Sequence, residues 1–118
     1  MNNVRRQKLN KSLKQIVSAI VAQYEPEKVI LFGSLAQGKT SEWSDLDLVI
    51  IKDTPLPFTQ RSKEVALLCP VWVGVDYLVY TPEEFDQMIA ERNPFILNEV
   101  LQKGKVLYER QPAVEMAG

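Results

Sequence analysis

The sequence predicts a single α/β or α+β domain built on a small, largely buried sheet. Its 118 residues are the length of one domain. Short, wholly apolar runs are typical of buried strands. Here they alternate with segments in which apolar residues recur every three or four positions, as on one face of a helix. No repeat, low-complexity run or internal linker interrupts the pattern, so we expect one core.

The first half of the chain predicts one long helix and two short strands. Apolar residues at helical spacing run from residue 4 to 24, and Pro26 closes that helix. The apolar run 29–32 predicts a buried strand that stops at Gly33, and the run 46–51 predicts a second one.

The second half predicts three further helices and two strands. A short helix is expected over 59–68. A longer strand is expected over 71–80, which is rich in β-branched and aromatic residues. The Thr-Pro-Glu-Glu sequence at 81–84 predicts a helix start, because it combines a cap, a proline in the first turn and acidic residues against the helix dipole. A last helix over 94–103 and a short edge strand over 106–108 complete the set.

The composition excludes some kinds of active site. There is no histidine, which rules out histidine-based catalytic triads and histidine-ligated zinc. Basic and acidic residues number 14 and 15, so there is no strong signal for nucleic-acid binding. One basic cluster near the N-terminus is interpreted as the solvent face of the first helix: Arg5, Arg6, Lys8, Lys11 and Lys14.

The sequence also bears on location and assembly. It has no apolar run near the roughly 20 residues that a membrane span requires, and no signal peptide opens it. We therefore expect a cytoplasmic protein with no membrane partner. An oligomer stays possible, because the apolar face of the first helix and residues 95–97 suit either a core or an interface, although a core is favoured.

The stretch GSLAQGKT, residues 33–40, fits the phosphate-binding P-loop pattern G-x-x-x-x-G-K-[ST] letter for letter. A P-loop also requires a helix directly after the loop. Only four residues separate Thr40 from Asp45, too few for that helix or for a parallel crossover, which requires about a dozen or more residues, most of them helical. The second strand is therefore expected to return antiparallel, and the P-loop match is interpreted as a coincidence.

A second pattern in the same stretch predicts a metal and nucleotide site. Gly33 and Ser34 follow the first strand, where a glycine allows close approach to a phosphate and neighbouring N–H groups form an anion nest. Side chains alternate along a strand, so Asp45 and Asp47 point to one face. Asp76 interrupts a later apolar strand and completes the cluster if the two strands are neighbours. Crowded carboxylates repel one another, and Mg2+ relieves that repulsion.

Each part of this pattern has an ordinary structural interpretation. A Gly-Ser pair often forms a simple turn, and a single aspartate on a strand often faces solvent. The combination of Gly-Ser, ten intervening residues, D-x-D on an apolar strand and a later strand aspartate favours the site. Two metals bridged by such a cluster would activate an attacking oxygen and stabilise a leaving pyrophosphate.

These residues resemble the nucleotidyltransferase superfamily of DNA polymerase beta, and the short chain resembles its minimal nucleotidyltransferase branch. The segment GSLAQGKTSEWSDLDLVI is similar to the family's GS-x10-D-x-D signature, and VDYLVYTPEEF to its third-carboxylate strand. The resemblance implies an α+β fold with a small, mixed, mostly antiparallel sheet flanked by helices. One position departs from the pattern: Gln37 stands where the family often has arginine.

The resemblance implies a role for each site residue. Gly33 and Ser34 would hold the β- and γ-phosphates of ATP. Asp45 and Asp47 would bind Mg2+ in a two-metal site. Asp76 would be the third metal ligand and would help to activate the acceptor hydroxyl.

The resemblance also implies a partner. Family members of this size resemble antitoxins paired with HEPN-domain ribonuclease toxins, and some transfer AMP from ATP to a toxin tyrosine. The leading hypothesis is thus a protein AMP-transferase acting as an antitoxin. The alternatives are a catalytically weak module that neutralises a partner by contact, and an enzyme that modifies a small molecule. The expected organisation is one domain over 1–110, with its helix at 4–24 and catalytic core at 29–108, then a flexible tail over 111–118.

Overall fold

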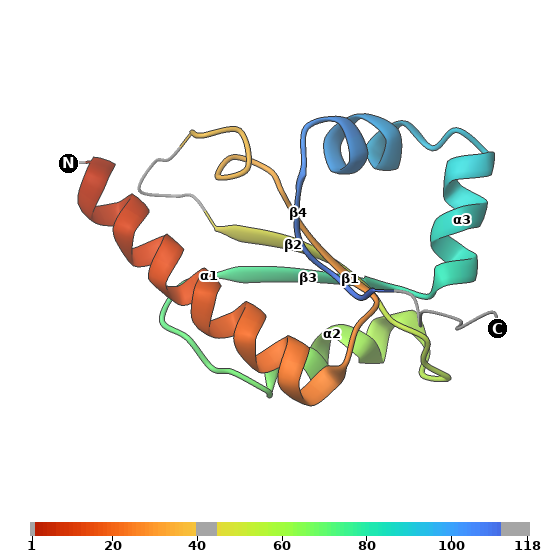
Figure 1. The fold of residues 1–118 in the computed structure, drawn as a ribbon, viewed down its shortest axis with the longest axis horizontal. Coiled ribbons are helices and arrows are strands. Elements are labelled where there is room, and N and C mark those ends of the chain that lie inside the picture. The colour runs from red at the N-terminus through yellow and green to blue at the C-terminus, as the bar shows by residue number, and fades with distance from the viewer. Residues whose placement is uncertain (1, 40–44, 112–118) are drawn as a thin grey trace, which may run out of the picture.

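A computed structural model describes residues 2–39 and 45–111 of the chain. It shows one sheet between two layers of helices (Figure 1). The elements in chain order are α1 (Asn2–Tyr24), β1 (Lys28–Phe32), β2 (Leu46–Ile51), α2 (Phe58–Ala66), β3 (Val75–Tyr80), α3 (Pro82–Ala90), η1 (Phe95–Gln102) and β4 (Lys105–Glu109).

The sheet is mixed and mostly antiparallel. Its four strands lie in the order β3-β2-β1-β4. β1 pairs antiparallel with both β2 and β4, whereas β2 and β3 run parallel. The expected α+β class and the antiparallel return of the second strand are both confirmed. Parallel neighbours require a long crossover, and α2 lies on the connection from β2 to β3.

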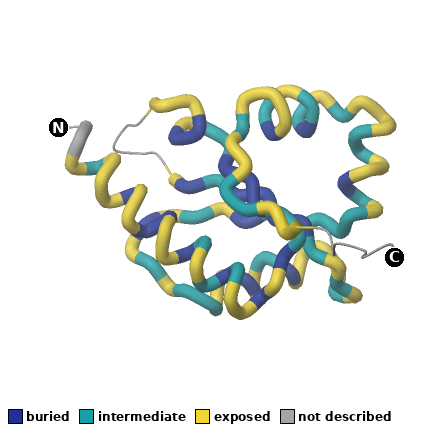
Figure 2. The backbone as a smooth tube through the Cα atoms, viewed as in Figure 1, coloured by how far each residue is buried: buried dark blue, intermediate teal, exposed yellow. Residues whose placement is uncertain are grey.

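Each face of the sheet buries its own apolar cluster. Figure 2 shows the buried residues gathered along the strands and the inward sides of the helices. On one face α1 and α2 cover the sheet, with Leu9, Ile16 and Val65 in the cluster. On the other face η1 and α3 do so, with Ile96 and Phe85. Strand residues alternate between the two clusters, so the face that carries a side chain is fixed by its position along the strand.

The strand predicted over 71–80 is shorter than expected. β3 begins only at Val75, and the segment before it bends away, leaving Trp72 97% exposed. A strand forms only where it has a neighbour to pair with. β2 begins at Leu46, whose N–H donates to the Gly74 carbonyl at 3.0 Å, so residues 71–73 have no strand beside them among the residues that the structure describes. The β-branched composition of the segment did not reveal this limit.

The last predicted helix is a π-helix, η1. The bond from the Lys103 N–H to the Asn98 carbonyl, at 3.1 Å, spans five residues, whereas an α-helix spans four. The predicted apolar spacing fits both kinds of helix. The helix stops before Gly104, where an added Cβ would lie 2.2 Å from the Val100 carbonyl oxygen. A glycine is therefore required at the turn into β4.

The start of α3 is as predicted. The Thr81 side chain accepts from the Glu84 N–H at 3.1 Å, and the Glu84 side chain accepts from the Thr81 N–H at 2.9 Å. This reciprocal pair is a capping box. Glu84 also binds Arg61 of α2, whose side chain is only 6% exposed, so the cap links two helices across β3.

Two further expectations concern the ends of the chain. α1 begins at Asn2, slightly before the predicted residue 4. Residues 112–118 of the expected tail lie outside the described residues. Over residues 2–39 and 45–111, none of the helices combines the length and apolar character needed to cross a membrane.

Candidate active site

Two carboxylates meet where β2 and β3 run side by side. The parallel register of these strands sets Asp47 directly beside Asp76. Asp45 immediately precedes β2 and, because side chains alternate, it shares a face with Asp47. The sequence predicted this cluster on the condition that the two strands are neighbours, and the structure shows that they are.

Two glycines make room for these carboxylates. Gly33 follows β1 with a φ of +80°, and an added Cβ there would lie 2.3 Å from Oδ2 of Asp47. At Gly74, just before β3, an added Cβ would lie 2.5 Å from Oδ1 of Asp45. Both distances are far shorter than any contact between a real Cβ and an oxygen, so larger residues would displace the aspartates.

The cluster changes the acidity of its most buried member. Burial raises the pKa of Asp47 to about 6, and the negative charge of Asp76, a hydrogen bond with the Asp76 side chain and the charge of Asp45 add to the effect. At neutral pH the carboxylates are thus held together against their mutual repulsion. A bound cation would remove that cost.

The donor chemistry of the cluster fits a divalent cation such as Mg2+. Mg2+ prefers oxygen ligands and is typically held by one or two carboxylates together with water and substrate phosphates. Within the described ranges, no three Asp, Glu, His or Cys side chains form a ready-made metal cage. The adjacent Asp47 and Asp76 are the pair that fits such a partly protein-bound ion, and Asp45 stands next to them.

The segment after β1 is a compact turn, as predicted, and is not a P-loop. The Ser34 carbonyl accepts from the N–H groups of Gln37 at 3.1 Å and Lys39 at 2.9 Å. The turn ends at Gly38, whose φ is +74°. Since β2 returns antiparallel to β1, the strand–loop–helix arrangement of a P-loop is missing from the described part of this segment. Thr40, the last residue of the P-loop pattern, lies outside the described residues.

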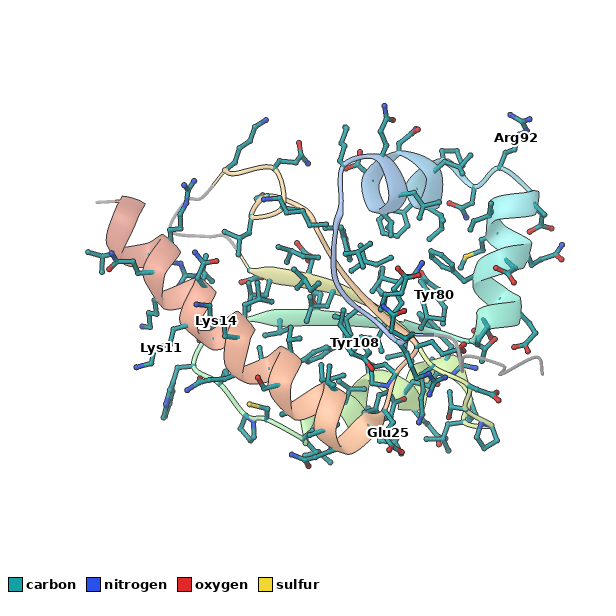
Figure 3. The ribbon with its side chains drawn as sticks, viewed as in Figure 1. Lys11, Lys14, Glu25, Tyr80, Arg92 and Tyr108 are labelled. Carbon is teal, nitrogen blue, oxygen red and sulfur yellow. The ribbon has the colours of Figure 1, made fainter. Side chains whose placement is uncertain are left out.

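Arg6 of α1 contacts this turn, which the sequence did not predict. Its Nη2 donates a hydrogen bond to the carbonyl of Gly38, 32 residues along the chain. Arg6 is an exposed residue of α1, as predicted, and so are Lys11 and Lys14, whose side chains are labelled on that helix in Figure 3. The Arg6 guanidinium therefore lies at Gly38, the residue next to Gln37, where the family often has arginine. No local signal distinguished Arg6 from its basic neighbours.

A groove of about 540 Å3 opens beside the carboxylate pair. Asp47 and Asp76 lie in its wall together with Phe32 and Phe95. The two aromatic rings pack edge to face, with centroids 5.3 Å apart and an angle of 87°. The groove thus offers an apolar aromatic wall next to an acidic one. Neither phenylalanine was predicted to belong to the site, because tertiary packing of η1 against β1 brings them together.

Comparison with known proteins identifies the family of the chain. A family model described as Polymerase beta, Nucleotidyltransferase matches residues 14–113. A protein of Methanocaldococcus jannaschii, provisionally named a protein adenylyltransferase, is 33% identical over 100 residues, which are 83% of this chain and 96% of that protein. MntA of Haemophilus influenzae, whose name as a protein adenylyltransferase is also provisional, is 43% identical over 81 residues, or 64% of this chain and 71% of its own.

One of two similar solved structures shows the same fold. A provisionally assigned nucleotidyltransferase from Sulfolobus solfataricus matches with a TM-score of 0.63 at 22% identity, covering 89% of this chain and 84% of that one. A toxin–antitoxin complex described as MntA-HpeT gives a TM-score of 0.49 at 16% identity, over 83% and 73% of the two chains. The first likeness shows the fold alone, and the second is too low to support an inference.

Proposed function

The chain belongs to the polymerase beta nucleotidyltransferase family, and we propose that it is a Mg2+-dependent enzyme that transfers AMP from ATP to a protein hydroxyl. The observation that carries this proposal is the in-register pair of Asp47 and Asp76, with Gly33 leaving the space that Asp47 occupies. A structural role alone does not explain two adjacent carboxylates on an otherwise apolar pair of strands, because their repulsion lowers stability.

We assign the donor side of the site to the turn after β1. Gly33 and Ser34 hold the β- and γ-phosphates through backbone N–H groups and the exposed Ser34 hydroxyl. Asp45, Asp47 and Asp76 are the residues that would hold Mg2+, as one ion or as a two-metal site. When bound, Mg2+ neutralises the charge of the triphosphate and of the pyrophosphate product.

The reaction we propose is a single displacement at phosphorus. The acceptor hydroxyl oxygen attacks the α-phosphorus of ATP and forms a new P–O bond. The bond from that phosphorus to the oxygen bridging the β-phosphate breaks, and pyrophosphate leaves with the electron pair. Asp76, exposed and in the wall of the groove, accepts the hydroxyl proton and passes it to solvent.

The proposed acceptor is a tyrosine of a partner protein, a HEPN-type toxin that the chain would neutralise. The groove supports an aromatic acceptor, because a phenol ring would pack against Phe32 and Phe95 while its oxygen reaches the carboxylates. The names of both relatives, as protein adenylyltransferases, support a protein acceptor. A second candidate function is neutralisation by contact alone, which the exposed Gln37 in place of arginine favours.

Label transfer tests the proposal. The protein is incubated in cell lysate with Mg2+ and ATP labelled on either the α- or the γ-phosphate, beside Asp47→Asn and the control Asp86→Asn, which changes an exposed aspartate of α3. We expect protein-bound α-label with the wild type and the control, and none with Asp47→Asn. Transfer by Asp47→Asn would rule out the proposed site. Neutralisation of a toxin without any label would favour the contact-only function.

A further inference from the structure

One edge of the sheet borders the groove. Among the described residues, β3 is the outermost strand on its side and pairs only with β2. Four consecutive residues of β3, from Val75 to Leu78, line the groove together with residues of α2. The groove therefore follows β3 and has the carboxylate pair in its wall.

The backbone of β3 points alternately toward β2 and away from it. The N–H of Leu46 donates to the Gly74 carbonyl at 3.0 Å, and the N–H of Lys52 donates to the Tyr80 carbonyl at 2.9 Å. Since the N–H and C=O of one strand residue point the same way and alternate along a strand, even-numbered residues face β2. The backbone groups of Val75, Tyr77 and Val79 consequently face outward.

Within the described part of the chain, a hydrogen bond from α2 closes the C-terminal end of this edge. Nη1 of Arg61 in α2 donates to the Val79 carbonyl at 3.1 Å. No hydrogen bond between the described residues engages the outward N–H and C=O of Val75 or Tyr77. The open stretch is thus limited to the residues that flank Asp76. Unpaired strand edges are ready sites for pairing with another chain.

We propose that the acceptor protein binds as an extended segment that adds a strand to β3 between Val75 and Leu78. This inference rests on the proposed function and specifies how its substrate is held. Backbone groups of the segment pair with those of Val75 and Tyr77, and its side chains alternate between the two faces. The side chain opposite Asp76 then lies on the same face as Asp76, about 5 Å away between Cβ atoms. That side chain carries the hydroxyl.

The groove suits such a segment in size and position. Its volume of about 540 Å3 matches a few extended residues. Gly33 and Ser34, assigned to the ATP phosphates, do not line it, so donor and acceptor would approach the carboxylates from different sides. The opposite edge strand, β4, is separated from β3 by two strands and offers no route to the aspartates.

A proline at the edge tests the backbone pairing. Val75→Pro removes an outward N–H at the first residue of an edge strand, where proline is tolerated. Val75→Ala keeps that N–H and measures the effect of losing the side chain. We expect the KM for the protein acceptor to be at least about tenfold higher for Val75→Pro than for Val75→Ala, because the proline ring also blocks the incoming chain. Equal KM values in two folded variants would overturn the inference.

Backbone methylation of the acceptor gives an independent test. A seven-residue peptide centred on the modified residue, located by mass spectrometry of the labelled acceptor, is methylated at one backbone nitrogen at a time. We expect loss of transfer at every second position, since only alternate N–H groups face β3. Uniform tolerance, or uniform loss, would overturn strand addition, as would α-label found in RNA. Absence of any transfer by the wild type would instead contradict the proposed function itself.

Discussion

Gly33 and Gly38 form a matched pair that tests how the site is positioned. Both glycines have positive φ, +80° and +74°, so alanine at either position costs about 1–2 kcal/mol of stability. Their surroundings differ. An added Cβ at Gly33 would lie 2.3 Å from Oδ2 of Asp47, whereas one at Gly38 meets nothing within 4 Å.

The clash at Gly33 converts into a displacement of the carboxylate. An ordinary contact between a Cβ and an oxygen is near 3.4 Å, so Oδ2 of Asp47 must move by about 1 Å. A carboxylate oxygen at the end of a side chain moves that far by rotation, which costs little stability. A shift of 1 Å at a reacting group, however, lowers the rate by about 100-fold. We therefore expect Gly33→Ala and Gly38→Ala to lose similar stability and to differ about 100-fold in AMP transfer.

Three measurements check this expectation. Urea unfolding gives the stability of both variants, α-label transfer gives their rates, and NMR titration of the Asp47 carboxyl gives its pKa. Gly33→Ala should move the pKa of Asp47 away from about 6, and Gly38→Ala should leave it there. Similar rates and similar pKa values in the two variants would refute the idea that Gly33 sets the position of Asp47.

Three further predictions follow from charges in the structure. Folding raises the pKa of Asp47, so the Asp47 charge destabilises the folded protein as the pH rises from about 4 through 6. In EDTA, urea unfolding should show that Asp47→Asn gains about 1 kcal/mol of stability at pH 8, a value reduced for the partial exposure of Asp47, and gains none at pH 4. The hydrogen bond from Arg61 lowers the pKa of Glu84, so this bond stabilises the folded protein at neutral pH and is lost on acidification. At pH 7, Glu84→Gln should lose about 1–3 kcal/mol of unfolding free energy, and the exposed control Glu83→Gln almost none. Arg6→Ala should slow AMP transfer about three- to tenfold with little change in melting temperature, whereas the control Lys14→Ala should change neither. An equal effect of the two variants would mean that the positive charge of α1, and not the hydrogen bond to Gly38, affects the rate.

The features that sequence alone could predict depend on local chemistry. Alternation along a strand placed Asp45 and Asp47 on one face whatever the remainder of the chain did. The lack of room for a helix between Thr40 and the second strand excluded a parallel pair, and the Thr81 cap located the start of α3. In each case the deciding residues lie close together along the chain.

The features that sequence could not predict depend on distant partners. β3 begins where β2 begins, so composition over 71–74 gave no information about its start. The apolar spacing of η1 fits an α-helix as well as a π-helix. Arg6 reaches Gly38 across 32 residues, and Phe32 meets Phe95 only because η1 packs on β1. These contacts follow from the folded arrangement and have no local signature.

The alternation of β3 connects the catalytic site with the proposed docking edge. Asp76 lies beside Asp47 because the even-numbered residues of β3 bond to β2. The same alternation turns the backbone of Val75 and Tyr77 outward, directly on either side of Asp76. A register shift of one residue would remove the aspartate from its partner and also change which backbone groups the edge presents. The position of the acid and the position of the proposed incoming strand are therefore set by one structural choice, so an acceptor that paired with this edge would be placed beside Asp76.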